Sequence, residues 1–260
     1  MRRRPSLLQI IYSRRTVRRF SKSKPLSEDV VKMLVEAGQR APCYYQAYSV
    51  IWVRDEERIK SLAEICDSET TRSMILNASA VLLICVDFYR LRVLLNSLGH
   101  HHILSEDKFP VEAFYGVFET GLMVENICIA AEVLGLGSAL LDCALFECER
   151  IALLFQLPHG VIPAAILCVG EKGENPPPRP RWPLEHVLHI DAYKPVQAED
   201  VEAYLDLSEK ILASEGYLRK YAEWNGSYTE YLMERTLLTK EIKKTYDAIA
   251  SFLTRNGLKL

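Results

Sequence analysis

The sequence predicts a large domain of mixed helices and strands, or such a core with a helical appendage. The chain has 260 residues, of which 49% are hydrophobic, and this is enough to bury a full core. Two continuous apolar runs, Ala80–Val86 and Ala164–Gly170, are typical of strands that are buried on both faces. From about Ala198 onward the pattern becomes helical and charged.

Positive charge is concentrated near the N-terminus. The formal net charge is −2, so the chain as a whole is not a binder of polyanions. The N-terminal arginines are Arg2, Arg3, Arg4, Arg14, Arg15, Arg18 and Arg19. A basic start on a mostly acidic remainder indicates one discrete anionic ligand rather than a nucleic-acid surface.

The cysteines and the lengths of the apolar runs indicate the cellular compartment in which we expect the protein. The seven cysteines show no framework of regularly spaced pairs, and Cys85, Cys128 and Cys168 lie inside apolar runs. We therefore expect a reducing, cytoplasmic setting. No run reaches the roughly 20 apolar residues of a transmembrane helix, and the N-terminal charges are not followed by the apolar segment of a signal peptide.

The segment Tyr12–Phe20 is the first candidate for a binding site. It carries four arginines and two hydroxyl side chains, and it follows a short helix anchored by Ile10 and Ile11. A guanidinium group offers a fixed fork of donors that suits phosphate oxygens, and a helix end or tight turn can direct several such groups at one anion. The alternative is a solvated basic arm.

An aromatic loop, Cys43–Tyr48, leads directly into a predicted strand at Tyr48–Val53. The helix before it begins after Ser27, a typical N-cap, and ends at Ala41-Pro42 because the residue before a proline avoids the helical region. A loop in this place is a candidate for binding a planar ring. The alternative is ordinary packing of tyrosines at a helix–strand corner.

The strongest helical pattern covers Phe114–Leu134 and leaves little polar face. Such a helix is either central in the monomer or part of a dimer interface, and Gly121 permits close approach of another helix. Further helices are expected at Glu56–Cys66 and Glu147–Phe155.

Two short motifs resemble known sites without matching them. Gly135-Leu136-Gly137 follows a helix and lacks the third glycine of a dinucleotide fingerprint, so we interpret it as a turn into a strand at Ser138–Leu141. The run His100–His102 cannot direct three adjacent side chains at one metal, and a solvated loop is favoured there over a zinc site.

A proline-rich segment, Pro176–Pro183, carries a second pair of arginines. Arg179 and Arg181 point to the same side if the segment is extended, and the alternative is a surface linker. The helices expected after it, Val201–Leu212 and about Tyr228–Leu253, would pack on the core or on a partner subunit.

Four of these motifs, in order along the chain, resemble the FMN-dependent nitroreductase family. The first is Arg14–Phe20, followed by Pro25-Leu26-Ser27 and a helix that ends in Ala-Pro. Gln46-Ala47-Tyr48 is similar to the family's Gln-Pro-Trp, Leu134–Gly137 to its flavin-facing turn, and Arg179–Leu184 to its Lys-Pro-Arg phosphate clamp. The C-terminal helices and the closing Phe252–Leu258 are similar to the larger, oxygen-insensitive nitroreductase and flavin-reductase subgroup.

This resemblance implies an α+β fold, in which helices flank a mixed sheet and two copies intertwine as a homodimer with FMN at the interface. Residues 1–195 would form the FMN-binding core, and residues 196–260 a helical C-terminal extension. The electron donor would be NAD(P)H.

The resemblance also assigns binding residues. The flavin phosphate would be held by Arg14, Arg179 and Arg181. The ribityl chain and pyrimidine edge would be lined by Arg15, Thr16 and Arg18. The isoalloxazine ring would be bracketed by Gln46, Ala47 and Tyr48, and the N5 side would be lined by backbone groups of Leu141, Asp142 and Cys143.

The implied reaction passes hydride from NAD(P)H through FMN to a small aromatic, nitro, quinone or flavin acceptor. It requires no catalytic protein nucleophile, acid–base group or metal, because the cofactor carries the redox step. Asp142 stands where the subgroup tends to have glycine, and the aromatic loop is unusual. These departures leave open an FMN-binding protein with a dedicated, different redox step.

A third interpretation, from another class, is a basic-headed nucleic-acid-binding module. Arg2–Arg4 together with Arg14–Arg19 motivate it. The acidic remainder and the buried strands count against it, and we expect no nucleic-acid or membrane partner.

Overall fold

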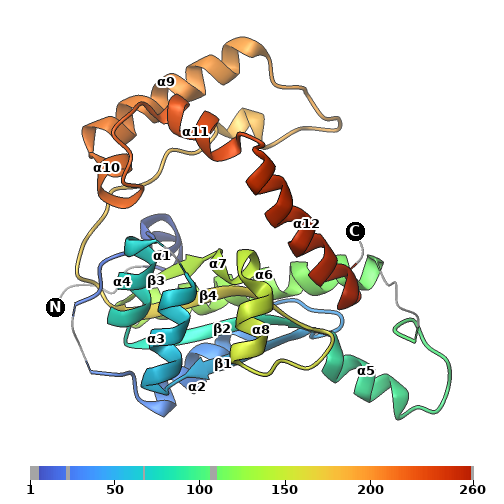
Figure 1. Ribbon diagram of the computed structural model, residues 1–260. Helices are drawn as coiled ribbons and strands as arrows, with labels where there is room; N and C mark the ends of the chain where they lie inside the picture. The colour runs from blue at the N-terminus through green and yellow to red at the C-terminus, as the bar shows by residue number, and fades with distance from the viewer. Residues whose placement is uncertain (1–5, 22–23, 67, 106–109, 259–260) are drawn as a thin grey trace. The chain divides into compact units, whose positions relative to one another are not determined.

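The computed structural model describes residues 6–21, 24–66, 68–105 and 110–258, and it confirms the α+β fold class (Figure 1). The chain divides into two compact units. The first comprises Met1–Pro176 together with Lys240–Leu260, and the second comprises Pro177–Thr239. The C-terminal extension expected at 196–260 is therefore divided, because its last part, Lys240–Leu260, belongs to the first unit.

A four-stranded sheet forms the centre of the first unit among the described residues. Each pair of neighbouring strands is antiparallel. The sheet is therefore antiparallel and not mixed as expected; an isolated parallel bridge joins Thr16 to Ser138 at its edge. In spatial order the strands are β1 (Tyr48–Val53), β2 (Ala80–Asp87), β4 (Val161–Glu171) and β3 (Leu136–Leu141).

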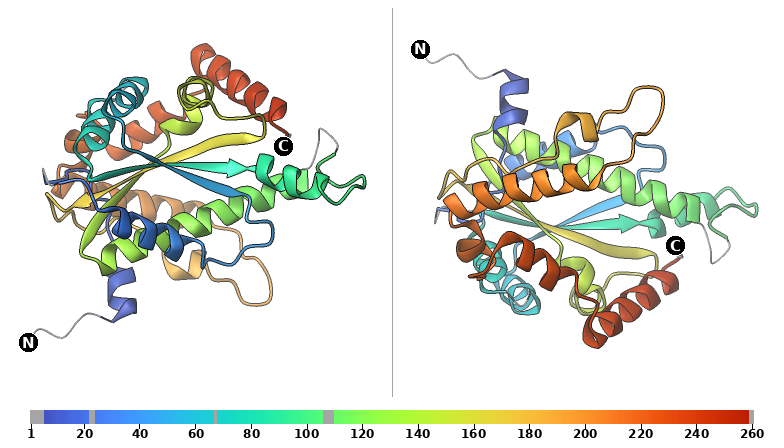
Figure 2. Two further views of the ribbon diagram at one scale, coloured as in Figure 1. Left: turned by 90° about the horizontal axis from the view of Figure 1, so that it is seen from below. Right: turned by 90° about the horizontal axis from the view of Figure 1, so that it is seen from above.

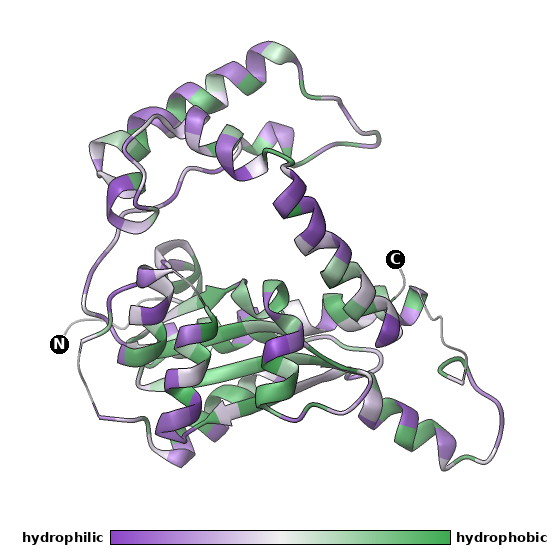
Figure 3. Cartoon of the chain, in the orientation of Figure 1, coloured by the Kyte–Doolittle hydropathy of each residue, from purple (hydrophilic) through white to green (hydrophobic). Residues whose placement is uncertain are grey.

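Helices cover both faces of the sheet, which is why its central strands are continuous apolar runs (Figures 2 and 3). Every residue of β2 is buried. One face packs against α2 (Glu28–Gly38) and α6 (Pro110–Val133). The other face packs against α3 (Glu56–Ile65), α4 (Glu69–Asn77) and α8 (Cys148–Leu154).

Local signals in the sequence set several element ends. The Ser27 side chain accepts a hydrogen bond from the backbone N–H of Val30 and caps α2 as predicted. Gly135, with φ of +78°, ends α6 and turns the chain into β3, which confirms the predicted turn. Three helices were not predicted in this unit, namely α4, α5 (Phe88–Asn96) and the short α7 (Cys143–Phe146).

The prediction of one helix over Tyr228–Leu253 is wrong. The chain forms α11 (Tyr228–Thr236) and α12 (Lys240–Arg255), which belong to different units. The side chain of Phe252 on α12 is buried in the core of the first unit with Phe88 and Ile162. This burial supplies a tertiary reason for the break, which periodicity alone cannot show.

The second unit is helical. Its elements are a 3₁₀ turn η1 (Leu184–His186), α9 (Ala198–Ser214), α10 (Tyr217–Tyr221) and α11. Leu212 and Leu218 are buried there, and the Trp182 ring stacks on the Tyr204 ring with centroids 4.1 Å apart. The expected helix at Val201–Leu212 is confirmed within α9.

The cysteines are mostly buried thiols. Cys85, Cys128 and Cys168 are free and buried, as their apolar surroundings predicted. Cys66 and Cys143 form a disulfide, which the spacing of the cysteines did not indicate. Of the helices in the described residues, none has both the length and the apolar character that a bilayer crossing requires.

Candidate functional site

The basic segment Tyr12–Phe20 is fixed to the edge of the sheet rather than solvated along its length. It begins in the last turn of α1 (Leu7–Ser13) and then runs beside the start of β3. The backbone N–H of Val17 donates to the carbonyl of Ser138 at 3.0 Å, and the Val17 side chain is 1% exposed. Gly137 permits this contact, because a Cβ at that position would lie 2.6 Å from a Val17 methyl group.

Ionic and hydrogen-bonding groups hold the arginines of this segment. The Arg14 Nε lies 3.6 Å from the carboxylate of Glu125 on α6. One Arg15 amino group donates to the Tyr12 and Arg14 carbonyls at 2.8 Å each. The Glu174 carboxylate accepts the backbone N–H of Arg18 at 2.7 Å, and this bond fixes the position of the Arg18 backbone.

The aromatic loop Cys43–Tyr48 is organised by a buried carboxylate. Glu119 on α6 is 2% exposed, and its carboxylate accepts the backbone N–H groups of Tyr44, Tyr45 and Ala47. Gln46 lies between these donors with φ of +51°, a conformation that is uncommon for residues other than glycine.

The carbonyl groups of the same loop are held by a cation. An amino group of Arg90, on α5, donates to the Gln46 carbonyl at 2.6 Å and to the Tyr48 carbonyl at 2.7 Å. The Ala47 carbonyl accepts the backbone N–H of Asp87 at 3.0 Å. The loop backbone is therefore tied to the core from both sides.

The three ring-binding candidates of the loop differ in exposure. Gln46 is exposed, whereas Ala47 and Tyr48 are buried. Burial raises the pKa of the Tyr48 hydroxyl, and its side chain packs with Leu34 on the α2–α6 side of the sheet. Of the three side chains, that of Gln46 is the one presented at the surface of this chain.

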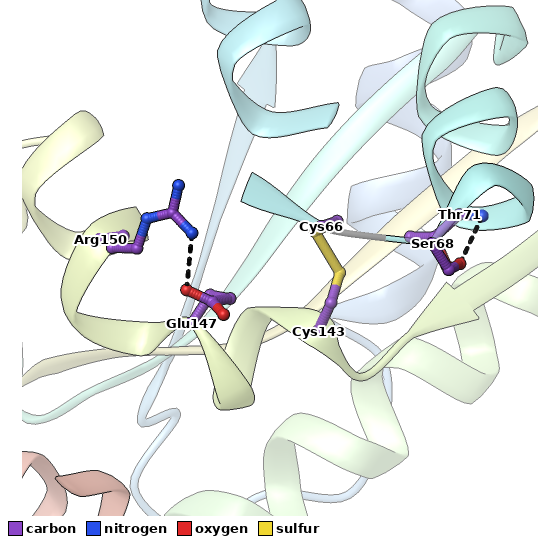
Figure 4. Close-up of a disulfide and its surroundings, with 6 residues drawn as sticks. All are labelled: Cys66, Ser68, Thr71, Cys143, Glu147 and Arg150. Carbon is purple, nitrogen blue, oxygen red and sulfur yellow. Dashed lines mark hydrogen bonds and ion pairs between the residues drawn. A yellow bond between two sulfur atoms is a disulfide. The ribbon is translucent and has the colours of Figure 1, made fainter. Parts of the chain in front are cut away.

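The candidate N5 loop follows β3 directly. Leu141 is buried, Asp142 is exposed, and Cys143 begins the short helix α7 (Cys143–Phe146). Asp142 stands at the N-cap of α7 without a capping hydrogen bond from its side chain. Cys143 is joined to Cys66 at the end of α3, so the disulfide ties this loop to α3 (Figure 4).

Strand register separates two of these groups of candidates. Thr16 lies beside Ser138, which pairs with Val169 of β4. Tyr48 pairs through β2 with Ile162, at the other end of β4. The stretch of β4 from Ile162 to Val169 spans roughly 23 Å, so within one chain the basic segment and the aromatic loop lie at opposite ends of the sheet.

The second pair of arginines belongs to the second unit. The Arg179 guanidinium lies over the ring of Tyr217, and an Arg181 amino group donates to its own neighbour, the Pro180 carbonyl, at 3.2 Å. Convergence of these arginines with Arg14 on one phosphate stays a prediction.

The histidine run lines a cavity of about 630 Å³ together with Tyr45, Leu91 and Leu95. The His102 ring lies within hydrogen-bonding distance of the Asn96 side chain, 2.8 Å from Nε2, and its Nδ1 accepts the Leu104 N–H at 3.1 Å. Within the described ranges, no group of three or more His, Cys, Asp or Glu residues is placed to hold a metal ion.

Sequence reasoning missed three residues that shape the site: Glu119, Glu174 and Arg90. A signal existed only for Glu119, which is an acidic residue in the middle of the strongly apolar helix α6. It lies three residues after Gly116 and four before Met123, both buried, and so it shares their buried face. Its partners, the loop amides, are more than 70 residues away in sequence.

Comparisons with known proteins agree with this architecture. The sequence profile of the nitroreductase family matches residues 11–171. An NADPH-dependent oxidoreductase from Staphylococcus aureus is 33% identical over 196 residues, which are 71% of this chain and 72% of that protein.

Solved structures give the same result across most of the chain. NfrA1 from B. megaterium is 25% identical with a TM-score of 0.79, covering 94% of this chain and 98% of that one. The NADPH:FMN oxidoreductase from Vibrio harveyi, complexed with NAD⁺, is 20% identical with a TM-score of 0.78, covering 97% and 98%, and this likeness shows the fold.

Proposed function

This chain belongs to the nitroreductase family, and we therefore propose that it is an FMN-dependent oxidoreductase. It uses NAD(P)H as the electron donor and reduces a small aromatic, nitro, quinone or flavin acceptor. Bound FMN supplies the hydride-transfer chemistry, and the protein supplies binding, orientation and electrostatics.

The observation that carries this proposal is the fixed position of the basic segment on the edge of β3. The main chain of Val17 and Arg18 is held by Ser138 and Glu174, so the arginine side chains extend from a backbone whose position is fixed. Guanidinium forks and a threonine hydroxyl form a donor set that fits the phosphate, hydroxyl and carbonyl groups of FMN. Arg14 is the phosphate ligand in this proposal, and Arg15, Thr16 and Arg18 bind the ribityl chain and pyrimidine edge.

The remaining assignments follow the same proposal. Gln46 would bound one side of the ring, with the buried Ala47 and Tyr48 holding the loop behind it, and the backbone of Leu141, Asp142 and Cys143 would lie toward N5. Arg179 and Arg181 add a second pair of cations for the phosphate. A cation such as Arg18 near N1 would stabilise the negative charge of the reduced ring.

A homodimer is part of the proposal. The side chains of Phe114, Val117 and Phe118 on α6 are each more than half exposed, and a Cβ built on Gly121 would meet nothing within 4 Å beyond its own stretch of α6. A large apolar surface of this kind is typical of a subunit interface. The roughly 23 Å between the basic segment and the aromatic loop supports a flavin that contacts Arg14 of one copy and Gln46 of a second copy.

The purified protein tests the proposal directly. We expect a yellow protein, or uptake of added FMN in a titration followed by flavin absorbance. Addition of NADPH or NADH under anaerobic conditions should then bleach the flavin. A colourless protein that takes up no FMN would refute the proposal.

A second candidate function keeps FMN but changes the reaction. Asp142 is exposed at the end of β3 and its side chain does not cap α7, so its carboxylate is available to act on a dedicated substrate. In this case neither nicotinamide would reduce the flavin quickly. Fast bleaching by either one in an anaerobic mixing experiment rules out this second function.

A further inference from the structure

Glu119 places a carboxylate in the interior of the protein, and its ligands are backbone N–H groups. The side chain enters from α6 and is 2% exposed. It accepts the N–H groups of Tyr44 and Tyr45 on Oε1, the latter at 2.7 Å, and that of Ala47 on Oε2 at 3.2 Å. Concave sets of successive backbone N–H groups bind anions, and here the anion belongs to the protein itself.

Burial of a carboxylate is costly unless its oxygens accept hydrogen bonds, and here the N–H groups of the aromatic loop supply these bonds. The three donors surround Gln46, whose φ of +51° is uncommon for its residue type. The Gln46 carbonyl is held separately by Arg90 at 2.6 Å. The peptide group between Gln46 and Ala47 thus has its carbonyl bound to Arg90 and its N–H bound to Glu119, while the Gln46 side chain is exposed.

We propose that Glu119 is the positioning residue of the aromatic loop: it holds Tyr44–Ala47 so that the Gln46 amide is presented to the flavin ring. This inference rests on the proposed function for the identity of the ligand. It goes beyond that function by assigning a role to a residue that does not contact the cofactor.

The first experiment requires no cofactor. Hydrogen exchange of the full chain, freed of flavin, is measured by mass spectrometry for the wild type and for Glu119→Gln. Glutamine replaces one acceptor oxygen by an NH₂ group that opposes an N–H donor, so peptides covering 43–48 should exchange at least about tenfold faster. The control is Glu64→Gln, an exposed carboxylate on α3, which should exchange like the wild type. Unchanged protection of 43–48 in Glu119→Gln overturns the proposal.

The second experiment measures FMN affinity in a double-mutant cycle. We expect Glu119→Gln to weaken FMN binding by about tenfold, the equivalent of one charge-assisted hydrogen bond. Gln46→Ala should have a similar effect. In the Gln46→Ala background, the added effect of Glu119→Gln should fall to less than about twofold, because the group it positions is already gone.

Additive effects in that cycle would overturn the positioning role, since a general loss of packing does not depend on Gln46. Glu119→Asp should recover part of the wild-type affinity, because it keeps the carboxylate on a shorter side chain. If the wild-type chain takes up no FMN, the proposed function fails, and the exchange experiment still decides whether Glu119 holds the loop.

Discussion

The two arginine-bearing segments of this chain are held in different ways. The basic segment Tyr12–Phe20 docks its backbone on the sheet, with Val17 buried and the Arg18 N–H bound to Glu174. The segment around Arg179 and Arg181 is held within the helical unit by rings, through Trp182 on Tyr204 and Arg179 over Tyr217.

This difference concerns the stability of the structure that holds each segment. The first segment shares the stability of a sheet that is covered on both faces. The second depends on a small unit in which few large side chains are buried, Leu212 and Leu218 among them. Local opening is easier where fewer apolar contacts are lost, so the contribution of Arg181 to binding should vary with conditions more than that of Arg18.

Removal of the Cys66–Cys143 disulfide should give the largest effect, a loss of stability that is confined to the first unit. The bond closes a loop of 77 residues, and its loss should lower the free energy of unfolding of the first unit by up to about 4 kcal/mol. All seven cysteines precede Pro177, so the second unit should be unaffected.

Denaturant titration with tryptophan fluorescence checks this prediction. Trp52 lies in β1, whereas Trp182 and Trp224 lie in the second unit, so variants that keep one or the other report each unit separately. The double variant Cys66→Ser, Cys143→Ser should shift the Trp52 transition alone. Cys43→Ser, which removes an exposed free thiol, is the control. An equal shift of both transitions would show that the two units unfold together.

Arginine removal tests whether both segments reach one FMN molecule. Arg18→Ala and Arg181→Ala should each weaken FMN binding by about 1.5–3 kcal/mol, the range of a hydrogen bond to a charged group. Arg58→Ala, an exposed arginine on α3, should leave FMN affinity unchanged. Titrations followed by flavin fluorescence give the three affinities. Unchanged binding in Arg181→Ala alone would confine the FMN site to the first segment.

Gly137→Ala should undo the docking of the first segment. The added Cβ would lie 2.6 Å from a Val17 methyl group and 3.0 Å from the Lys172 side chain, so the segment must move away from β3. We expect a loss of about 1–3 kcal/mol in stability, as for other overpacked sites, and faster hydrogen exchange of the Val17 amide. Leu140→Ala, on the same strand with an exposed side chain, is the control. Unchanged Val17 exchange in Gly137→Ala would contradict the observed contact.

Local chemistry explains which parts of the fold the sequence predicted. The strand Tyr48–Val53 and the cap at Ser27 depend on residues within a few positions of each other, and both were predicted correctly. The pairing of Cys66 with Cys143 and the break between α11 and α12 depend on distant packing, and neither was predicted.

The candidate site shows the same division. Arginines in the first segment were proposed as ligands from residue type, because guanidinium chemistry does not depend on the fold. The residues that fix the site could not be identified in that way. Glu174 is 156 positions from Arg18, and no periodicity connects an acid at that distance with the amide that it binds.

Trp182→Ala should have the smallest effect and act only on the second segment. It removes a stacked ring pair at the surface, a loss of about 1 kcal/mol in the stability of the helical unit, which Trp224 fluorescence can follow. Trp182→Phe keeps an aromatic ring over Tyr204 and should retain most of that stability. If Arg181 binds the phosphate from this unit, FMN affinity should fall slightly in Trp182→Ala, and the added effect of Arg181→Ala should shrink. The effect of Arg18→Ala should be the same in both backgrounds, because the sheet holds that arginine. An equal reduction for Arg18 and Arg181 would mean that the two segments are held by one cooperative structure.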